Sequence, residues 1–252
     1  MNKIKYLIIL FWAVAYTAAA QNPEMVRIKS GSYIPLYGAD SSRVKVKDFL
    51  IDTIPVTKAE YKEFLRQNPQ WQRSNIKGIF SKKTYLHDWK GDLEYDEGRD
   101  LEPVVNVSWF AAKEYCRFIG KRLPSVDEWE YVAMADQRDK DAREKETFNQ
   151  YILSWYEKPK QSGQKVGSTF KNYWGVYDMH GLVWEWTSDF NSVMIASESR
   201  SSGNNTNLFC SAAAIGATDL MNYAAFMRYA YRSSVKASFT GNYLGFRCAK
   251  DI

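Results

Sequence analysis

The stretch Asn172–Trp186, NYWGVYDMHGLVWEW, shows what kind of fold this chain can form. Glycines and single polar residues interrupt its aromatic residues at irregular spacing, so neither the helical period nor the strand period is maintained. The same character continues from Tyr151 to the C-terminus, where Gly, Asn, Ser and aromatic residues are frequent. The sequence therefore predicts short strands joined by long ordered loops, which depend on buried aromatic rings and loop hydrogen bonds, or on metal ions.

Regular elements are easier to recognise upstream of this stretch. Met25–Ile28 and Val44–Lys47 alternate like half-buried strands. Helices are expected where a capping residue precedes apolar residues on one helical face. Three such helices are predicted, over Lys58–Arg66, after Ser108 and after Ser125. The mixed charges of Asp136–Glu146 predict a solvated helical extension or loop.

The first residues have the features of a secretory signal peptide. Lys3 and Lys5 form a basic head, residues 6–15 an apolar stretch, and Ala18–Ala20 a small-residue cleavage site. We therefore predict a signal peptide over residues 1–20 and one domain over residues 21–252. The alternative is a retained membrane anchor, although the apolar run is short for a span of roughly 20 residues.

Composition excludes several classes of protein. Among the 252 residues, 45% are hydrophobic, 15% aromatic and 25% charged, which excludes collagen, coiled coils and low-complexity disorder. Cleavage before Gln21 would lower the formal net charge from +5 to +3 by removing Lys3 and Lys5, too small a surplus for a nucleic-acid-binding protein. His87 and His180 are the only histidines, so a zinc hydrolase motif is absent. What remains is one aromatic-rich globular domain, expected to be a monomer without a membrane span after cleavage.

Three ordered motifs carry a resemblance to a known family. They are Pro103–Tyr131, containing PVVNVSW, KRLP and EWEY; Asn172–Trp186; and Leu244–Cys248, LGFRC. In this order they resemble the formylglycine-generating enzyme, or sulfatase-modifying factor, family over nearly the whole mature chain. The resemblance implies an α+β fold: a single C-type-lectin-like domain, loop-rich, with short strands and about three helices.

The resemblance also implies a disulfide and a calcium site. The disulfide would join Cys116 to Cys248. The calcium ligands would be the carboxylates of Asp178 and Glu185 and the backbone carbonyls of Gly181 and Val183, since hard oxygens suit this cation. The alternative is that Asp178 and Glu185 only cap and brace the tryptophan-rich turn.

One departure from the family affects its chemistry. Formylglycine-generating members use two nearby cysteines to bind copper(I) and oxidise a substrate cysteine, but Asp219 and Ala224 align with those positions here. The remaining cysteine is Cys210, which could be a relocated catalytic thiolate or a single ligand for copper, or else a buried small hydrophobic residue. Copper therefore stays open but lacks the usual cysteine pair.

Three residues match the family's substrate groove or lie near it: Trp184, Arg228 and Tyr243. Tyr243 replaces an asparagine that helps to hold the substrate in the family, so peptide specificity must differ. Arg228 and Arg232 could instead pair with acidic residues on the surface of the fold.

These observations leave three functions, and whether the chain is an enzyme stays open. The first is an accessory or maturation factor that is exported, to the periplasm or the medium, and acts on another exported protein or peptide. It could be an oxidoreductase that acts on a protein cysteine through Cys210. The second is a non-catalytic lectin-like binding module for a peptide, glycan or assembly partner. The third, sulfatase activation by formylglycine generation, is least favoured because it requires two redox-active cysteines.

Overall fold

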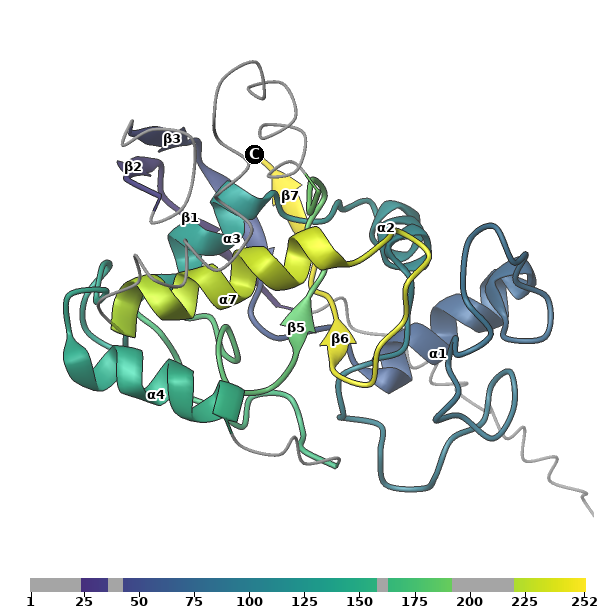
Figure 1. Ribbon diagram of the computed structural model, residues 1–252. Helices are drawn as coiled ribbons and strands as arrows, with labels where there is room; N and C mark the ends of the chain where they lie inside the picture. The colour runs from purple at the N-terminus through teal and green to yellow at the C-terminus, as the bar shows by residue number, and fades with distance from the viewer. Residues whose placement is uncertain (1–23, 36–42, 158–162, 192–219) are drawn as a thin grey trace, which may run out of the picture.

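The computed structural model describes residues 24–35, 43–157, 163–191 and 220–252. Its central sheet joins the two ends of the chain (Figure 1). β4 (Phe49–Asp52) lies between β1 (Met25–Ile28) and β7 (Ala249–Asp251), and both pairings are antiparallel. The predicted signal peptide and Cys210 lie outside the described residues.

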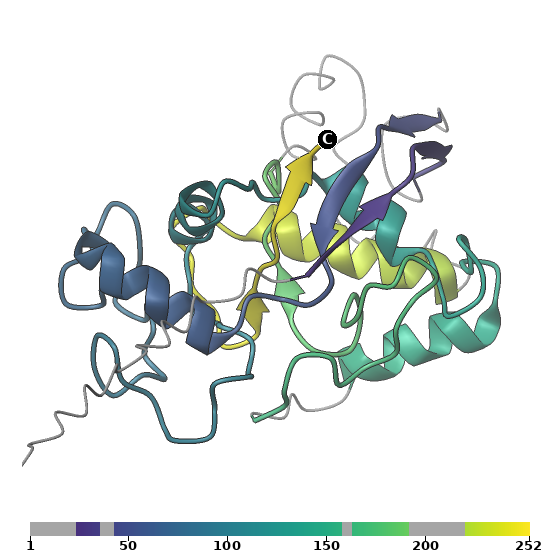
Figure 2. The ribbon, with the colours of Figure 1, turned by 180° about the vertical axis from the view of Figure 1, so that it is seen from behind.

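Two further sheets have two strands each. β2 (Gly31–Tyr33) pairs antiparallel with β3 (Val44–Val46), and β5 (Trp184–Glu185) pairs parallel with β6 (Leu244–Gly245). Figure 2 shows β1 and β4 extending towards β2 and β3 at one end of the molecule, with α1 at the other. The predicted α+β class with short strands is confirmed.

The three predicted helices are present and begin at the predicted caps. α1 (Lys58–Gln67) and α3 (Val126–Ala133) each have a complete capping box, and Ser108 caps α2 (Trp109–Phe118) through a 3.2 Å hydrogen bond from the Ala111 N–H. A short 3₁₀ helix, η1 (Pro69–Trp71), follows α1. Side-chain caps satisfy N–H groups that the first helical turn leaves unpaired.

Two described helices were not predicted, α4 (Glu146–Glu157) and α7 (Leu220–Ser234). They pack against each other, and the expectation of strands and loops from Tyr151 on is wrong for residues 151–157 and 220–234. The buried face of α7 includes Ala224, Arg228 and Arg232 at four-residue spacing. Because two of these residues are arginines, the hydrophobic pattern alone does not mark the buried face. Asp136–Lys145 forms a loop and no helix, and a loop was one of the two forms predicted for Asp136–Glu146.

The core has two main parts. One surrounds α1, α2 and the C-terminal segment, and the other fills the space between the central sheet and α3. The disulfide Cys116–Cys248 lies in the first part, has a Cα–Cα distance of 5.7 Å and closes a sequence separation of 132 residues, as predicted. No helix in the described ranges is long and apolar enough to cross a bilayer.

Candidate functional site

The tryptophan-rich turn and the C-terminal motif meet where β5 pairs with β6. The Trp184 N–H donates to the Tyr243 carbonyl at 2.7 Å, and the Trp186 N–H donates to the Gly245 carbonyl at 3.0 Å. A Cβ atom at Gly245 would lie 2.7 Å from the Val104 carbonyl oxygen, so this close approach requires glycine. Sequence motifs far apart along the chain therefore form one backbone frame.

Glu185 is held in this frame by a buried ion pair. Its carboxylate accepts hydrogen bonds from Arg247 Nε at 2.8 Å and Nη2 at 2.7 Å, and from Trp129 Nε1 at 2.8 Å. The side chains of Glu185 and Arg247 are both fully buried. This bidentate pair is among the strong hydrogen-bonded ion pairs of proteins.

Asp178 also has its carboxylate engaged. It accepts hydrogen bonds from the backbone N–H groups of Gly167 and Thr169, and Thr169 Oγ1 accepts one from the Asp178 N–H at 3.0 Å. Asp178 has φ of 60°, in the left-handed region, which an aspartate tolerates better than most residues. These hydrogen bonds tie Asp178 to the loop at Gly167 and Thr169.

As placed, these residues do not fit a calcium ion. A cation beside Glu185 would have to share its carboxylate with the buried guanidinium of Arg247, and Asp178 already satisfies two N–H groups. Among the described residues, no three His, Cys, Asp or Glu side chains gather as a metal site. Calcium binding at Asp178, Gly181, Val183 and Glu185, expected from the sequence, is untested, and the contacts of Asp178 and Glu185 argue against it.

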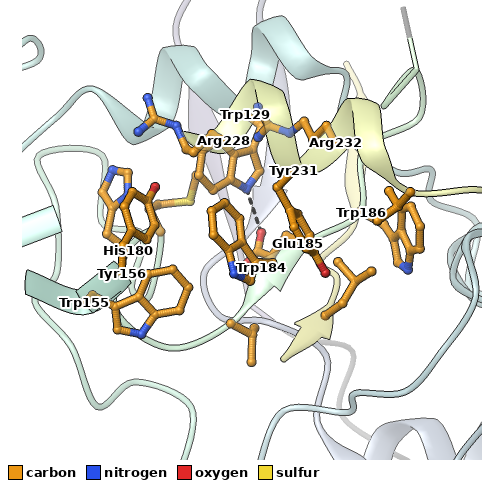
Figure 3. A pocket seen from close by; sticks show the side chains of 14 residues that line it. Trp129, Trp155, Tyr156, His180, Trp184, Glu185, Trp186, Arg228, Tyr231 and Arg232 are labelled. Atoms are coloured by element: carbon orange, nitrogen blue, oxygen red, sulfur yellow. Dashed lines mark hydrogen bonds between the residues drawn. The ribbon is translucent and has the colours of Figure 1, made fainter. Parts of the chain in front are cut away.

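Trp184 lines a cavity that its neighbours nearly fill (Figure 3). Its ring stacks on Tyr231 at 4.5 Å and on Tyr156 at 5.0 Å between centroids, and Trp155 packs at 5.4 Å. About 20 Å³ is left, which is room for about one water molecule. The predicted groove residue Trp184 is thus the centre of a packed stack.

Arg228 lines the same cavity, but its guanidinium is bound to Glu130. Arg228 donates from Nε at 3.0 Å and Nη2 at 2.7 Å, and Arg232 donates to the same carboxylate at 2.6 Å. Burial alone would raise the pKa of Glu130, but the two guanidinium groups outweigh it and lower that pKa to about 2. Arg228 and Arg232 therefore pair with an acidic residue, as the second interpretation of these arginines proposed. The pairing lies in the interior of the fold and not on its surface.

His180 adds no charge to this cavity. Burial, together with nearby Arg228, lowers the pKa of His180 to about 3, so its imidazole is neutral. Its Nε2 lies 2.8 Å from the Ala133 carbonyl, which can only accept, so Nε2 carries the proton. The tautomer is fixed by the backbone of α3.

Tyr243 lines a different and larger cavity of about 170 Å³, which we call the polar cavity. Its charged side chains come from the start of α1 and from loops that precede α2, and residues before β5 and before β6, among them Leu182, Val183 and Tyr243, also line it. Val183 lines both cavities. Trp184 and Arg228 thus line the first cavity and Tyr243 lines the second, although Trp184 and Tyr243 are hydrogen-bonded neighbours through their backbones.

Four charged side chains balance one another in the polar cavity. Lys58 is 1% exposed, and its Nζ lies 2.9 Å from Asp88 Oδ2 and 3.1 Å from Glu102 Oε2. Arg99 donates to Glu102 from Nε at 2.8 Å and Nη2 at 2.7 Å. Burial opposes ionisation of Glu102, but the hydrogen bonds from Arg99 and Lys58 lower its pKa. Two cations and two anions leave no net charge on these walls.

Asn106, which lines the polar cavity, has an unpaired buried acceptor. Its backbone has φ of 58° and joins two other segments, donating to the Gly241 carbonyl and accepting from the Leu86 N–H, each at 3.0 Å. Nδ2 donates to Asp88 Oδ1 at 2.9 Å, whereas Oδ1 is buried without a hydrogen-bond partner. A buried acceptor without a partner costs about 1–3 kcal/mol, so it favours a ligand that donates.

Tyr243 and Val183 were singled out from the sequence, but the charged residues and Asn106 of the polar cavity were missed. One signal could have indicated them: Lys58, Tyr61 and Leu65 share the buried face of α1. A lysine on such a face needs carboxylate partners, because burying an unpaired ammonium is costly. The sequence does not say which acids supply them.

The fold and the site define a class of protein. It is a loop-rich α+β domain that is closed by one disulfide and has a single further cysteine. The family described as "Sulfatase-modifying factor enzyme 1-like domain" matches residues 12–252, and the chain belongs to this family.

Known relatives agree with this assignment. The chain is 28% identical to "Inactive C-alpha-formylglycine-generating enzyme 2" of Mus musculus over 91% of this chain and 86% of that protein. It is 25% identical to "Formylglycine-generating enzyme" of Mus musculus over 84% of this chain and 68% of that protein. The solved structure of PvdO from Pseudomonas aeruginosa has a TM-score of 0.52 at 21% identity, over 91% of this chain and 95% of that one, which shows a shared fold.

Copper chemistry of the family's enzymes does not fit this chain's cysteines. The sequence has three cysteines, and Cys116 and Cys248 form the disulfide, so one thiol is left where a copper(I) dithiolate needs two. Ala224, one of the two residues aligned with the copper cysteines, is buried on α7. The other, Asp219, lies outside the described residues.

Proposed function

We propose that this chain is an exported maturation factor that binds a segment of another exported protein without oxidising it. The polar cavity carries this proposal, because it is the larger of the two cavities described above and contains an unpaired buried acceptor, Asn106 Oδ1. The single cysteine outside the disulfide and the similarity to a relative named "inactive" support binding over formylglycine generation.

The size of the polar cavity limits what it holds. At about 170 Å³ it is smaller than the roughly 300–1,000 Å³ of sites for drug-sized ligands. One inserted side chain with its peptide group fits this scale, and the rest of an extended segment would lie outside. The ligand is therefore a short stretch of polypeptide.

The charges of the cavity indicate which side chain enters. Lys58 and Arg99 are balanced by Asp88 and Glu102, so a charged ligand would disturb a neutral set. Asn106 Oδ1 accepts a hydrogen bond from the ligand, and Asp88 Oδ2, which has only its ion pair with Lys58, is a second acceptor. An uncharged donor side chain, such as Ser, Thr, Asn or Gln, meets these demands.

Peptide selection by phage display tests this function. The purified protein should enrich peptides with an uncharged polar residue at one position, and their affinity is then measured by fluorescence polarisation. Asn106→Gly removes the acceptor, and glycine tolerates the left-handed backbone. We expect affinity to fall about tenfold, the effect of one buried hydrogen bond.

The control is Asn75→Gly, in an exposed loop that does not line the cavity. It should bind the selected peptides like the wild type. The proposal is refuted if no peptide is enriched over background, or if Asn106→Gly binds as tightly as Asn75→Gly while both proteins remain folded.

A further inference from the structure

Three segments of this chain contain basic residues but no aspartate or glutamate. They are residues 64–87, 103–113 and 220–250. The chain has 29 acidic residues among 252, and we ask whether these three acid-free segments meet in space. If they do, that surface carries more positive than negative charge, although Asp92 is hydrogen-bonded to Ser74 at its edge.

The structure brings parts of all three segments together. The Lys82 N–H donates to the Ser238 carbonyl at 3.1 Å, and the Trp109 N–H donates to the Ala237 carbonyl at 3.0 Å. The rings of Phe80 and Phe110 pack with centroids 5.5 Å apart. Five exposed lysines lie on these parts, and we call them the lysine face: Lys77, Lys82, Lys83, Lys113 and Lys236.

Aromatic rings lie beneath the lysines. Lys82 Nζ is 5.0 Å from the centre of the Phe239 ring, and Lys113 Nζ is 4.7 Å from that of Trp109. Glu114, which follows Lys113, is already bound to Arg117 by two hydrogen bonds. The lysine face therefore keeps its positive charge, beside aromatic residues of the kind found at membrane interfaces.

An apolar residue projects from the lysine face. The Phe80 N–H donates to the Lys77 carbonyl at 2.9 Å, which closes a turn with Gly78 and Ile79 at its corners. Ile79 is 74% exposed, the highest value among the exposed large hydrophobic side chains of the described residues. A Cβ atom at Gly78 would meet nothing within 4 Å, so the turn stands clear of the rest of the protein.

We propose that the lysine face binds the surface of an anionic lipid bilayer, with Ile79 inserted among the headgroups. A projecting turn with an apolar tip suits shallow insertion, whereas a folded acidic protein would need a matching recess for Ile79. Lysines act as point charges on a diffuse anionic surface, whereas arginine suits bidentate recognition of single groups. Charge attraction and apolar insertion together hold a peripheral protein on a membrane.

Co-sedimentation with vesicles tests this surface. The protein should bind vesicles of phosphatidylcholine with phosphatidylglycerol, should not bind phosphatidylcholine alone, and should dissociate as salt is raised. Replacing Lys77, Lys82 and Lys83 together by glutamine should weaken binding roughly 100-fold, because each lysine near an anionic surface contributes about fivefold. Ile79→Ser should weaken it about tenfold through lost burial of the apolar side chain.

The matched control has the same net charge as the triple variant. It replaces Lys45, Lys47 and Lys250 by glutamine; these exposed lysines lie on or directly after β3 and on β7, outside the lysine face. This control should bind vesicles like the wild type. Equal losses in both triple variants would overturn the proposal, as would unchanged binding by Ile79→Ser. Full competition by soluble polyglutamate with no effect of Ile79→Ser would indicate an acidic protein partner instead.

Discussion

Glu130→Gln should destabilise the protein strongly, because it leaves Arg228 and Arg232 buried without a counter-charge. The Glu130 side chain is 8% exposed and accepts from both guanidinium groups at 2.6–3.1 Å. Lowering its pKa from 4.5 to about 2 corresponds to about 3 kcal/mol. Breaking a buried ion pair by removing one partner typically costs 3–5 kcal/mol, in agreement.

The loss should depend on pH in a defined direction. Because the pKa of Glu130 is lower in the folded state, its stabilisation is complete above the ordinary value of 4.5 and is lost as pH falls towards 2. The difference in unfolding free energy between wild type and Glu130→Gln should therefore be about 3 kcal/mol at neutral pH. It should shrink to about 1 kcal/mol near pH 3.

Urea unfolding followed by tryptophan fluorescence measures both values. Glu63→Gln serves as the control, since Glu63 pairs with Arg66 on the exposed surface of α1 and its loss should cost less than about 1 kcal/mol. A loss below about 1 kcal/mol for Glu130→Gln, or one that is the same at neutral and acid pH, would refute the buried triad. Arg228 would then be available to a ligand after all.

Three further predictions concern the cysteines and calcium. Replacing Cys116 and Cys248 by serine should lower the unfolding free energy by about 4–5 kcal/mol in the chain-entropy model, measured by chemical denaturation, and an unchanged midpoint would contradict this. Thiol titration of denatured, unreduced protein should find one thiol, and Cys210→Ala should find none; three thiols in the wild type would exclude the disulfide. Calcium should leave the Tm unchanged, because the Glu185 carboxylate is bound to Arg247, and a calcium-dependent rise that Glu185→Gln abolishes would restore the calcium site.

Much of the fold was predictable because its signals are local. The capping residues before α1, α2 and α3 are read from a few neighbouring positions, and so is the alternation in β1. α7 was missed because Arg228 and Arg232 occupy its buried face, and their partner Glu130 lies about 100 residues away in sequence. A pattern search that counts only apolar residues cannot find such a helix.

The site was less predictable than the fold, since it depends on contacts between distant segments. Motif matching placed Trp184, Arg228 and Tyr243 together, but the packing of Tyr156 and Tyr231 on Trp184 fills that space. The polar cavity instead combines the start of α1 with loops before α2 and before β6. Its unpaired acceptor, Asn106 Oδ1, depends on which distant groups surround that side chain, and the sequence does not reveal them.

A crystal structure of the protein with a selected peptide tests the central claim most directly. The account predicts that one uncharged polar side chain of the peptide enters the polar cavity, with a donor within hydrogen-bond distance of Asn106 Oδ1. The stack of Tyr156, Trp184 and Tyr231 should stay closed. A peptide bound instead between Trp184 and α7, with the stack opened and the polar cavity empty, would contradict it.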